Sequence, residues 1–219
     1  LLTEMQKLYL LVPLAPLVGA LIAGLLGRFI GPAWSHRATI SLVSVSLLAS
    51  IIIFLDVLEG NSYNGSVYTW LVTGDTRFEI GFLIDQLSAT MMVVVSLVSL
   101  MVHIYTIGYM HGDPGYQRFF SYISLFTFSM MMLVMSNNFL QLFFGWEAVG
   151  LVSYLLIGFW HKNQDFNDAA KKAFIMNRIG DLGFLVGIFI LGNLFSTLDY
   201  ASLKTAIAGA TNLDMYWLS

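Results

Sequence analysis

The sequence contains no cysteine, which removes disulfides, iron–sulfur ligation and a thiol nucleophile from consideration. Charged residues make up only 11% of the chain, against about 25% in soluble domains. The histidines lack a spacing typical of a metal or haem site: His36, His103, His111 and His161. The net charge is −3 without a basic tract, so we expect no nucleic-acid partner. We expect no cofactor in this chain, and any coupled redox chemistry belongs to other chains.

Hydrophobic residues are abundant instead, at 58% of the chain, and the mean hydropathy is +0.77. One soluble domain of this length could not hide that much apolar surface. A helix needs about 20 apolar residues to cross a bilayer. Six stretches meet or approach this length: Leu8–Leu26, Thr39–Leu58, Phe82–Ile107, Phe119–Met135, Phe139–Trp160 and Ala173–Phe195. The sequence therefore predicts an all-α polytopic membrane protein with six transmembrane helices.

A seventh apolar run, MYWL at 215–218, starts just before the end of the sequence, which begins at Leu1 rather than Met. We therefore expect a segment of a longer protein, with residues 1–219 forming a single membrane domain. Residues 196–214 before that run are amphipathic and predicted to lie at the membrane interface. The buried charged residues are expected within residues 82–195.

Residues 59–81 form the only long polar connection. Asn64–Gly65 and Thr73–Asp75 are turn signals, and the runs VYTWLV and RFEIGF are rich in β-branched and aromatic residues. This pattern predicts a short β-hairpin at the membrane surface, between the second and third helices.

The basic residues predict the orientation of the helices. Loops one, three and five carry six of them: Arg28, Arg37, Arg118, Lys162, Lys171 and Lys172. Loops two, four and six carry two, Arg77 and Lys204. Because basic loops stay on the cytoplasmic side, the hairpin is expected to face outward.

Glu147 lies near the middle of the fifth apolar stretch. A charge at that depth costs at least about 2.5–3.5 kcal/mol, so we interpret Glu147 as a proton-carrying carboxylate. Burial favours the neutral form of a carboxylate and a nearby cation favours the charged form, so a moving cation can drive proton uptake and release. The alternative is a structural carboxylate, hydrogen-bonded between helices. No cation shares its helix, so its partner is expected from another span.

Arg178 and Asp181 lie three residues apart in the sixth stretch, so they share a helix face and can pair. Such a pair is either a charge switch or a strut that never titrates. His103 near the end of the third stretch is either a titrating group or a satisfied histidine. Lys171 and Lys172 are either anchors at the inner face or a proton relay there. Asp85 is expected to cap the third helix.

Two runs carry a resemblance to a known family: FFGWEAVGLVSYLLIGFW at 143–160 and KAFIMNRIGDLGF at 172–184. They resemble signature spans of the antiporter-like subunit L, or chain 5, of proton-translocating NADH:quinone oxidoreductase, respiratory complex I. The runs at 10–28, 103–110 and 115–141 fit as well, so the resemblance covers nearly the whole chain.

This resemblance implies the first part of an antiporter-like inverted-repeat fold. It implies that Glu147 belongs to the proton path, that Arg178 and Asp181 form a switchable pair, and that a lysine on the seventh span is the partner of Glu147. FMN, iron–sulfur clusters and quinone are expected in other subunits, and an adjacent antiporter-like subunit and the lipid bilayer are the expected partners. A bacterial inner membrane is favoured over a mitochondrial one. The alternative function is a sodium/proton or potassium/proton antiporter subunit without redox coupling.

Overall fold

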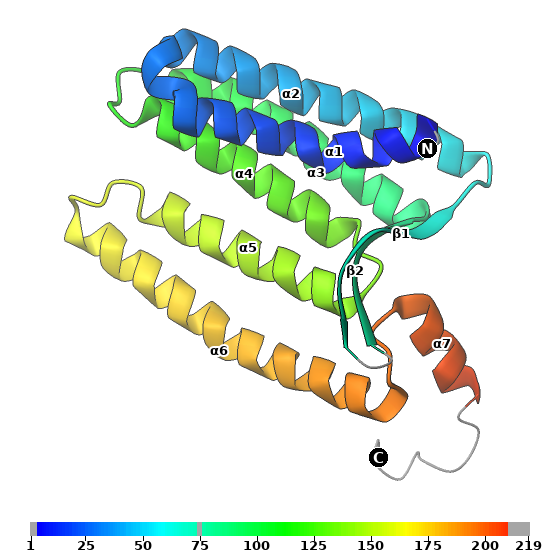
Figure 1. Ribbon diagram of the computed structural model, residues 1–219. Coiled ribbons are helices and arrows are strands. Elements are labelled where there is room, and N and C mark those ends of the chain that lie inside the picture. The colour runs from blue at the N-terminus through cyan, green and yellow to red at the C-terminus, as the bar shows by residue number, and fades with distance from the viewer. Residues whose placement is uncertain (1–3, 74–75, 210–219) are drawn as a thin grey trace.

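The computed structural model describes residues 4–73 and 76–209, and the side chains of all of these except 70–78. Helices dominate the chain, and Figure 1 shows the long ones running side by side along one axis. Their bounds are α1 Glu4–Leu21, α2 Gly27–Leu58, α3 Gln86–Tyr109, α4 Tyr116–Val134, α5 Phe139–Ile157 and α6 Gln164–Phe195, with the short α7 at Tyr200–Gly209. The seventh span predicted at 215–218 lies outside the described residues.

Helices α1 to α4 form a four-helix bundle. Helix α1 packs against α2 and α4, and α3 packs against α2 and α4. Two clusters fill its interior, one around Ile53, Met92 and Met131 and the other around Phe120 and Met110. Because lipid is as apolar as these side chains, close packing holds such a bundle together.

The connection between the first two helices contains fewer non-helical residues than the gap between the predicted stretches Leu8–Leu26 and Thr39–Leu58 suggests. A π-helical segment, Ile22–Leu26, follows α1 directly, and α2 begins at Gly27. The chain kinks inside α2 at Gly31, which adopts a φ of +77° and is followed by Pro32. A glycine is favoured there because side chains are strained at positive φ. The helical segment that follows this kink therefore begins after Gly31, ahead of the predicted Thr39.

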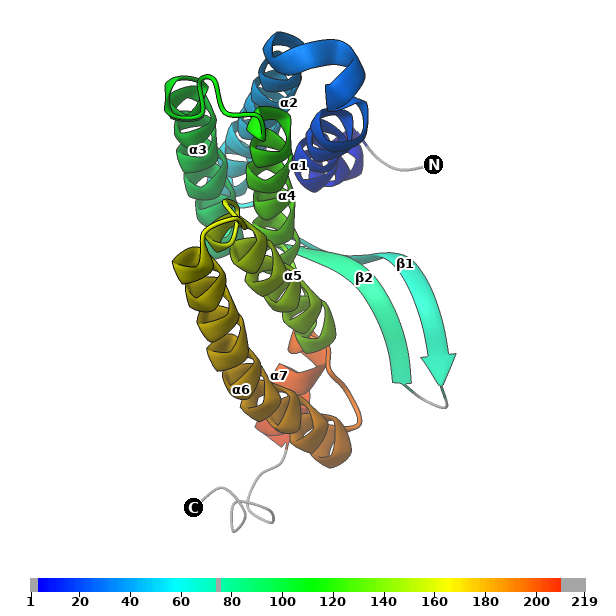
Figure 2. The ribbon, with the colours of Figure 1, turned by 90° about the vertical axis from the view of Figure 1, so that its left-hand side faces the viewer.

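The predicted hairpin is present as strands β1 Tyr63–Thr73 and β2 Thr76–Ile84, which pair antiparallel. Asn64 and Gly65 belong to β1 rather than to a turn. Figure 2 shows the hairpin bending away from the helices. Because β2 continues to Ile84, α3 begins at Gln86 and not at the predicted Phe82. The prediction that Asp85 caps this helix is confirmed, since its carboxylate accepts a hydrogen bond of 2.8 Å from Ser88 N.

The turn between α4 and α5, residues 136–138, anchors the base of the hairpin. The side chain of Asn138 donates to Glu79 O at 3.1 Å, and Leu83 N donates to Met135 O at 2.9 Å. Gln141 at the start of α5 accepts from Gly81 N at 2.9 Å. The same turn holds the segment before α7, because Tyr200 N donates to the Asn137 carbonyl at 3.1 Å. These bonds fix where α5 starts.

Helices α5 and α6 form a second layer, which Figure 2 shows to one side of the bundle. Helix α5 packs against α4, and α6 packs mainly against α5. Helix α6 starts at Gln164, nine residues before the predicted Ala173, because Asn163 caps it by accepting from Asp165 N. Within the segment 196–214, residues Tyr200–Gly209 form the short helix α7, and the predicted place of this segment at the membrane interface stays a prediction.

Within the described residues, four stretches are long and apolar enough to cross a membrane: 4–58, 86–109, 139–157 and 164–195. The first contains both α1 and α2. Helix α4 is not among the four, and it begins with the polar residues Gln117 and Arg118. The chain is thus a mostly helical membrane protein, and the count of six spans stays a prediction. Figure 1 shows the α1–α2, α3–α4 and α5–α6 connections at one end of the molecule, which we call the basic end. Lys162 lies in the α5–α6 connection, and the other five basic residues lie in the N-terminal parts of α2, α4 and α6.

Candidate functional site

The charged residues within the apolar helices meet between α5 and α6. The connection between these helices spans only residues 158–163, so they run antiparallel and side by side. This places the middle of α5 opposite the middle of α6. Aromatic pairs mark the alignment, because Tyr154 lies 5.4 Å from Phe174 and Phe143 lies 5.9 Å from Phe184 between ring centroids.

Glu147 and Arg178 form an ion pair across the two helices, between Glu147 Oε2 and Arg178 Nη1. The prediction that the partner of Glu147 comes from another span is confirmed by this contact. That partner is Arg178 on α6. It is a different residue from the lysine on the seventh span that the resemblance implies. The guanidinium also lies over the Phe174 ring, 5.0 Å from its centroid. An ordinary cation–π contact of this kind holds the guanidinium on the α5 side of α6.

The predicted pairing of Arg178 with Asp181 is wrong for this conformation. No ion pair joins them in the described part of the chain, where the carboxylate of Asp181 accepts a 2.8 Å hydrogen bond from Trp146 Nε1. The physical reason is reach: both α6 residues face α5, and each finds a partner there. Two polar links therefore connect neighbouring residues of α5, Trp146 and Glu147, to one face of α6. Trp146 lies inside the apolar α5, next to Glu147, and Asp181 accepts its indole N–H there.

Burial differs sharply across this cluster. The Glu147 side chain is 16% exposed and that of Arg178 is 51% exposed. The second carboxylate oxygen of Glu147, Oε1, is buried and accepts no hydrogen bond from the residues that the structure describes. Asp181 is buried and acts electrostatically on Glu147. The cluster thus contains two carboxylates and one guanidinium, and only Glu147 is paired with that guanidinium. One negative charge is left over, and a single proton would neutralise it.

A cavity of about 480 Å³ adjoins the cluster. Its lining includes Trp146, Asn177 and Asp181, with apolar walls from α4 and α6. Polar side chains and this volume are sufficient for water molecules, which need polar partners in a cavity. The cavity therefore has room for water molecules next to the carboxylate of Asp181. The arrangement can hold and release a proton, and it contains no nucleophile or metal-binding set.

His103 does not belong to this cluster. It is fully buried inside the α1–α4 bundle, and its ring lies 6.1 Å from that of Phe120. Its Nδ1 lies 2.8 Å from the carbonyl oxygen of Ser99, one turn earlier, and its Nε2 has no hydrogen-bond partner. The structure thus satisfies one ring nitrogen locally and separates His103 from α5 and α6.

Lys171 and Lys172 lie on exposed early turns of α6, towards the basic end. Lys171 forms an exposed ion pair with Asp168 at 3.4 Å. Arg178 lies further along the same helix, so neither lysine takes part in the Glu147 ion pair. Among the described residues, no group of three or more histidine, aspartate or glutamate side chains is arranged to hold a metal ion.

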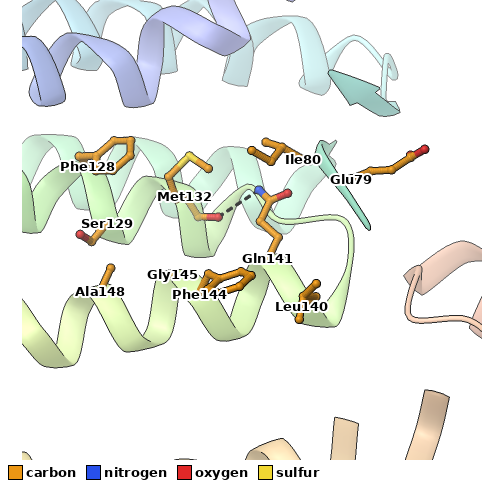
Figure 3. A pocket seen from close by; sticks show the side chains of 10 residues that line it. All are labelled: Glu79, Ile80, Phe128, Ser129, Met132, Leu140, Gln141, Phe144, Gly145 and Ala148. Carbon is orange, nitrogen blue, oxygen red and sulfur yellow. Dashed lines mark hydrogen bonds between the residues drawn. The ribbon is translucent and has the colours of Figure 1, made fainter. Parts of the chain in front are cut away.

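A second cavity, of about 340 Å³, lies on another face of α5, between α4 and α5 and beneath strand β2. Figure 3 shows Gln141 reaching across it to Met132, whose carbonyl accepts a 3.4 Å bond from Gln141 Nε2. Glu79 is the single ionisable residue of its lining, and Figure 3 shows its carboxylate pointing away. This cavity is therefore apolar, and the charged cluster stands apart from it.

Two family models match the chain. Residues 70–120 match the model described as "NADH-Ubiquinone oxidoreductase (complex I), chain 5 N-terminus". Residues 136–219 match the model described as "NADH:quinone oxidoreductase/Mrp antiporter, TM". The second match contains all three members of the charged cluster.

Curated relatives agree with these models. NADH-quinone oxidoreductase subunit L of Neisseria meningitidis serogroup A is 56% identical over 211 residues, which are 94% of this chain and 31% of that protein. NADH-ubiquinone oxidoreductase chain 5 of Dictyostelium citrinum is 41% identical over 199 residues, 90% of this chain and 30% of that protein. The chain therefore spans less than a third of the length of these relatives.

A solved structure supports the fold. A chain of the membrane-bound sulfane sulfur reductase, an archaeal respiratory membrane complex, superposes with a TM-score of 0.78 at 19% identity. The match covers 90% of this chain and 39% of the other. Together, the two family models and the curated relatives show that this chain belongs to the family of antiporter-like membrane subunits known as subunit L, or chain 5, of NADH:quinone oxidoreductase.

Proposed function

We propose that this chain is part of a proton-translocating membrane subunit of NADH:quinone oxidoreductase, and that Glu147 carries the proton. The observation that supports this role most directly is the ion pair of Glu147 with Arg178, in which one carboxylate oxygen stays buried and unpartnered. Quinone reduction, FMN and iron–sulfur clusters belong to other subunits in this proposal. The chain itself performs no redox chemistry.

The proposed mechanism is a transfer of one cation between two carboxylates. While Arg178 contacts Glu147, the charged form of Glu147 is favoured. Asp181 lies one turn further along the same face of α6, within the arc that a long arginine side chain can sweep. When the guanidinium moves to Asp181, Glu147 loses its counterion in a poorly hydrated place and takes up a proton. The return of the guanidinium expels that proton, and the titrations of the two carboxylates are coupled.

The remaining candidate residues have separate places in this proposal. Lys171 and Lys172 stand towards the basic end of α6, where an inner-face relay would begin. His103, with one free ring nitrogen inside the α1–α4 bundle, is assigned a proton-transfer role away from the ion pair. The proposed partners are other membrane subunits, above all an adjacent antiporter-like subunit. A bacterial inner membrane is proposed because the Neisseria relative is 56% identical and the Dictyostelium one 41%.

The test replaces Glu147 by glutamine in the full-length subunit within the assembled complex. Glu147→Gln keeps the shape of the side chain and removes its proton-binding carboxylate. We expect the number of protons moved per NADH oxidised, measured in inverted membrane vesicles by a pH-sensitive dye, to fall well below the wild-type value. Glu79→Gln on the hairpin is the matched control and should leave that ratio unchanged. Wild-type pumping by Glu147→Gln would contradict the proposal.

A sodium/proton or potassium/proton antiporter subunit is the second candidate, because the description of the family model that matches residues 136–219 includes the Mrp antiporter. The two functions differ in what drives transport. In the first, ΔpH forms on addition of NADH and disappears with a quinone-site inhibitor. In the second, an imposed sodium or potassium gradient suffices, and NADH has no effect.

A further inference from the structure

A polar cavity of about 230 Å³ lies at the basic end of the molecule, apart from the charged cluster. It is formed where the start of α4, the end of α5 and the start of α6 converge. Its polar lining consists of Arg118, Tyr122, Tyr154, His161 and Asn167. None of these residues takes part in the proposed transfer between Glu147 and Asp181.

Arg118 supplies the charge of this cavity. Its Nη2 donates a 3.2 Å bond to the Phe159 carbonyl, and its guanidinium lies 4.6 Å from the centroid of the Phe159 ring. No carboxylate forms an ion pair with it within the described residues. A guanidinium has five N–H donors, so the contact with Phe159 orients it and leaves most donors available.

The other polar groups of the lining add to this capacity. Neither Tyr122 nor Tyr154 uses its hydroxyl in a hydrogen bond among the described residues, and both line the cavity as donors. Asn167 Nδ2 donates to the His161 carbonyl at 2.7 Å, which ties the α5–α6 connection to α6. The cavity therefore presents one oriented cation and two hydroxyls on a fixed frame, which suits a phosphate group.

The position of the cavity indicates where such a phosphate comes from. Tyrosine and tryptophan gather at the level of lipid headgroups. The rings of Trp160, which follows the lining residue Phe159, and Tyr109 lie 6.4 Å apart between centroids in a tilted arrangement. The wall also includes the apolar Leu155 and Phe159, and Ile157 nearby is exposed. Basic pockets between transmembrane helices on the cytoplasmic side suit anionic headgroups. A lipid meets all of these surfaces at once, whereas a free phosphate ion meets only the polar ones.

We propose that this cavity binds the phosphate of an anionic phospholipid, with Arg118 as its principal ligand. Asp113 acts electrostatically on Arg118 but does not line the cavity. Its carboxylate is occupied, because Gly115 N and Trp160 Nε1 donate to it at 2.6 and 2.9 Å. Asp113 therefore fixes Trp160 at the mouth and leaves Arg118 to the lipid.

The experiment uses the full-length subunit in its intact purified complex, delipidated and exposed to vesicles of equal phosphatidylglycerol and phosphatidylcholine. A photoactivatable phosphatidylglycerol labels the wild-type complex, and mass spectrometry locates the labelled peptides. We expect label on peptides that contain Arg118 or residues 154–167, and a several-fold loss of it in Arg118→Gln. Both Arg118→Gln and Arg118→Lys lose the planar guanidinium that stacks on Phe159, but Arg118→Lys keeps the positive charge. Arg118→Lys should therefore retain more label than Arg118→Gln.

Arg37→Gln is the matched control. Arg37 also lies over an aromatic ring at the basic end, 5.5 Å from the Trp34 centroid, but it does not line the cavity that contains Arg118. Its removal should leave labelling of the Arg118 region unchanged. Equal labelling by a phosphatidylcholine probe, unchanged labelling in Arg118→Gln, or complete competition by millimolar inorganic phosphate would each overturn the proposal. If both Arg118 variants fail to assemble, wild-type label that avoids these peptides overturns it as well.

Discussion

Helices α2 and α6 are both 32 residues long, and both contain a stretch apolar enough to cross a membrane. Nine residues of α2 are buried within the chain, whereas only three residues of α6 are: Ala170, Asp181 and Ile188. The outer face of α6 is apolar and exposed, with Ile179, Leu182 and Phe189 each more than 60% exposed. Apolar side chains thus serve two purposes: those of α2 help to fill a core, and those of α6 present a surface to lipid or to another protein.

The polar residues of the two regions differ in the same way. Those buried in the α1–α4 bundle are mainly serine and threonine, and most of their hydroxyls donate to the carbonyl one turn earlier, as Ser50 and Thr127 do. Such bonds satisfy a hydroxyl without a partner from another helix. The α5–α6 layer instead places full charges between two helices. The bundle therefore satisfies its polar groups within its own helices. The charged cluster lies in a layer that needs lipid or another protein to cover its exposed side.

The largest effect is expected from removing core volume in the bundle. Phe120 of α4 is fully buried, and its ring lies close to those of His36 in α2 and His103 in α3. Phe120→Ala should therefore cost about 3–5 kcal/mol of unfolding free energy. Phe189 of α6 is 64% exposed, so Phe189→Ala should change the unfolding free energy by less than about 0.5 kcal/mol. Thermal unfolding of the full-length subunit in detergent measures both. Equal losses would show that the α6 face is also a packed core, and the comparison would fail.

A smaller effect tests how the two regions are joined. A Cβ on Gly145 of α5 would lie 2.8 Å from the backbone of Leu133 in α4, so Gly145→Ala forces the helices apart and should cost about 1–3 kcal/mol. A Cβ on Gly183 of α6 meets nothing within 4 Å. Gly183→Ala should be neutral or stabilise the subunit by up to about 1 kcal/mol, because alanine favours the helix. If Gly145→Ala is as neutral as Gly183→Ala, the α4–α5 contact is looser than the structure shows.

Local sequence patterns predict much of this fold. The apolar stretches predicted every long helix, and the turn signals predicted the hairpin, because both depend on neighbouring residues. The boundaries were missed where a distant partner decides them: β2 runs on to Ile84 because residues 135–138 bind it. Helix α6 starts early because Asn163 provides a cap that hydropathy does not register.

The three charged residues of the cluster were named from the sequence, but their pairing and the contact with Trp146 were not. Depth in an apolar stretch singled out Glu147, Arg178 and Asp181. Spacing along one helix then suggested an Arg178–Asp181 pair, since sequence separation is the only distance that a sequence contains. The register between α5 and α6 decides instead that Arg178 meets Glu147 and Asp181 meets Trp146. That register depends on packing and on the length of the connection, which no single stretch encodes.

The smallest expected effect concerns Asp113, whose contacts tie the bundle to the second layer at the basic end. The hydrogen bond from Trp160 at the end of α5 is the main cause that lowers the pKa of the Asp113 carboxyl below its ordinary 3.8, followed by the bond from Gly115 N. A lowered pKa in the folded state means that the charged carboxylate stabilises the fold. This contribution is complete above the ordinary pKa and is lost as the pH falls through the lowered value.

Asp113→Asn should therefore lower the unfolding temperature slightly at neutral pH, because it removes the charge and one acceptor. The difference between wild type and Asp113→Asn should shrink only in acid, below about pH 4. Thermal unfolding of the full-length subunit at a series of pH values, with Asp165→Asn as the control for an exposed acid at the same end, measures this. A difference that persists unchanged in strong acid would mean that Asp113 holds Trp160 through its shape rather than its charge. The tie between bundle and layer would then be insensitive to pH.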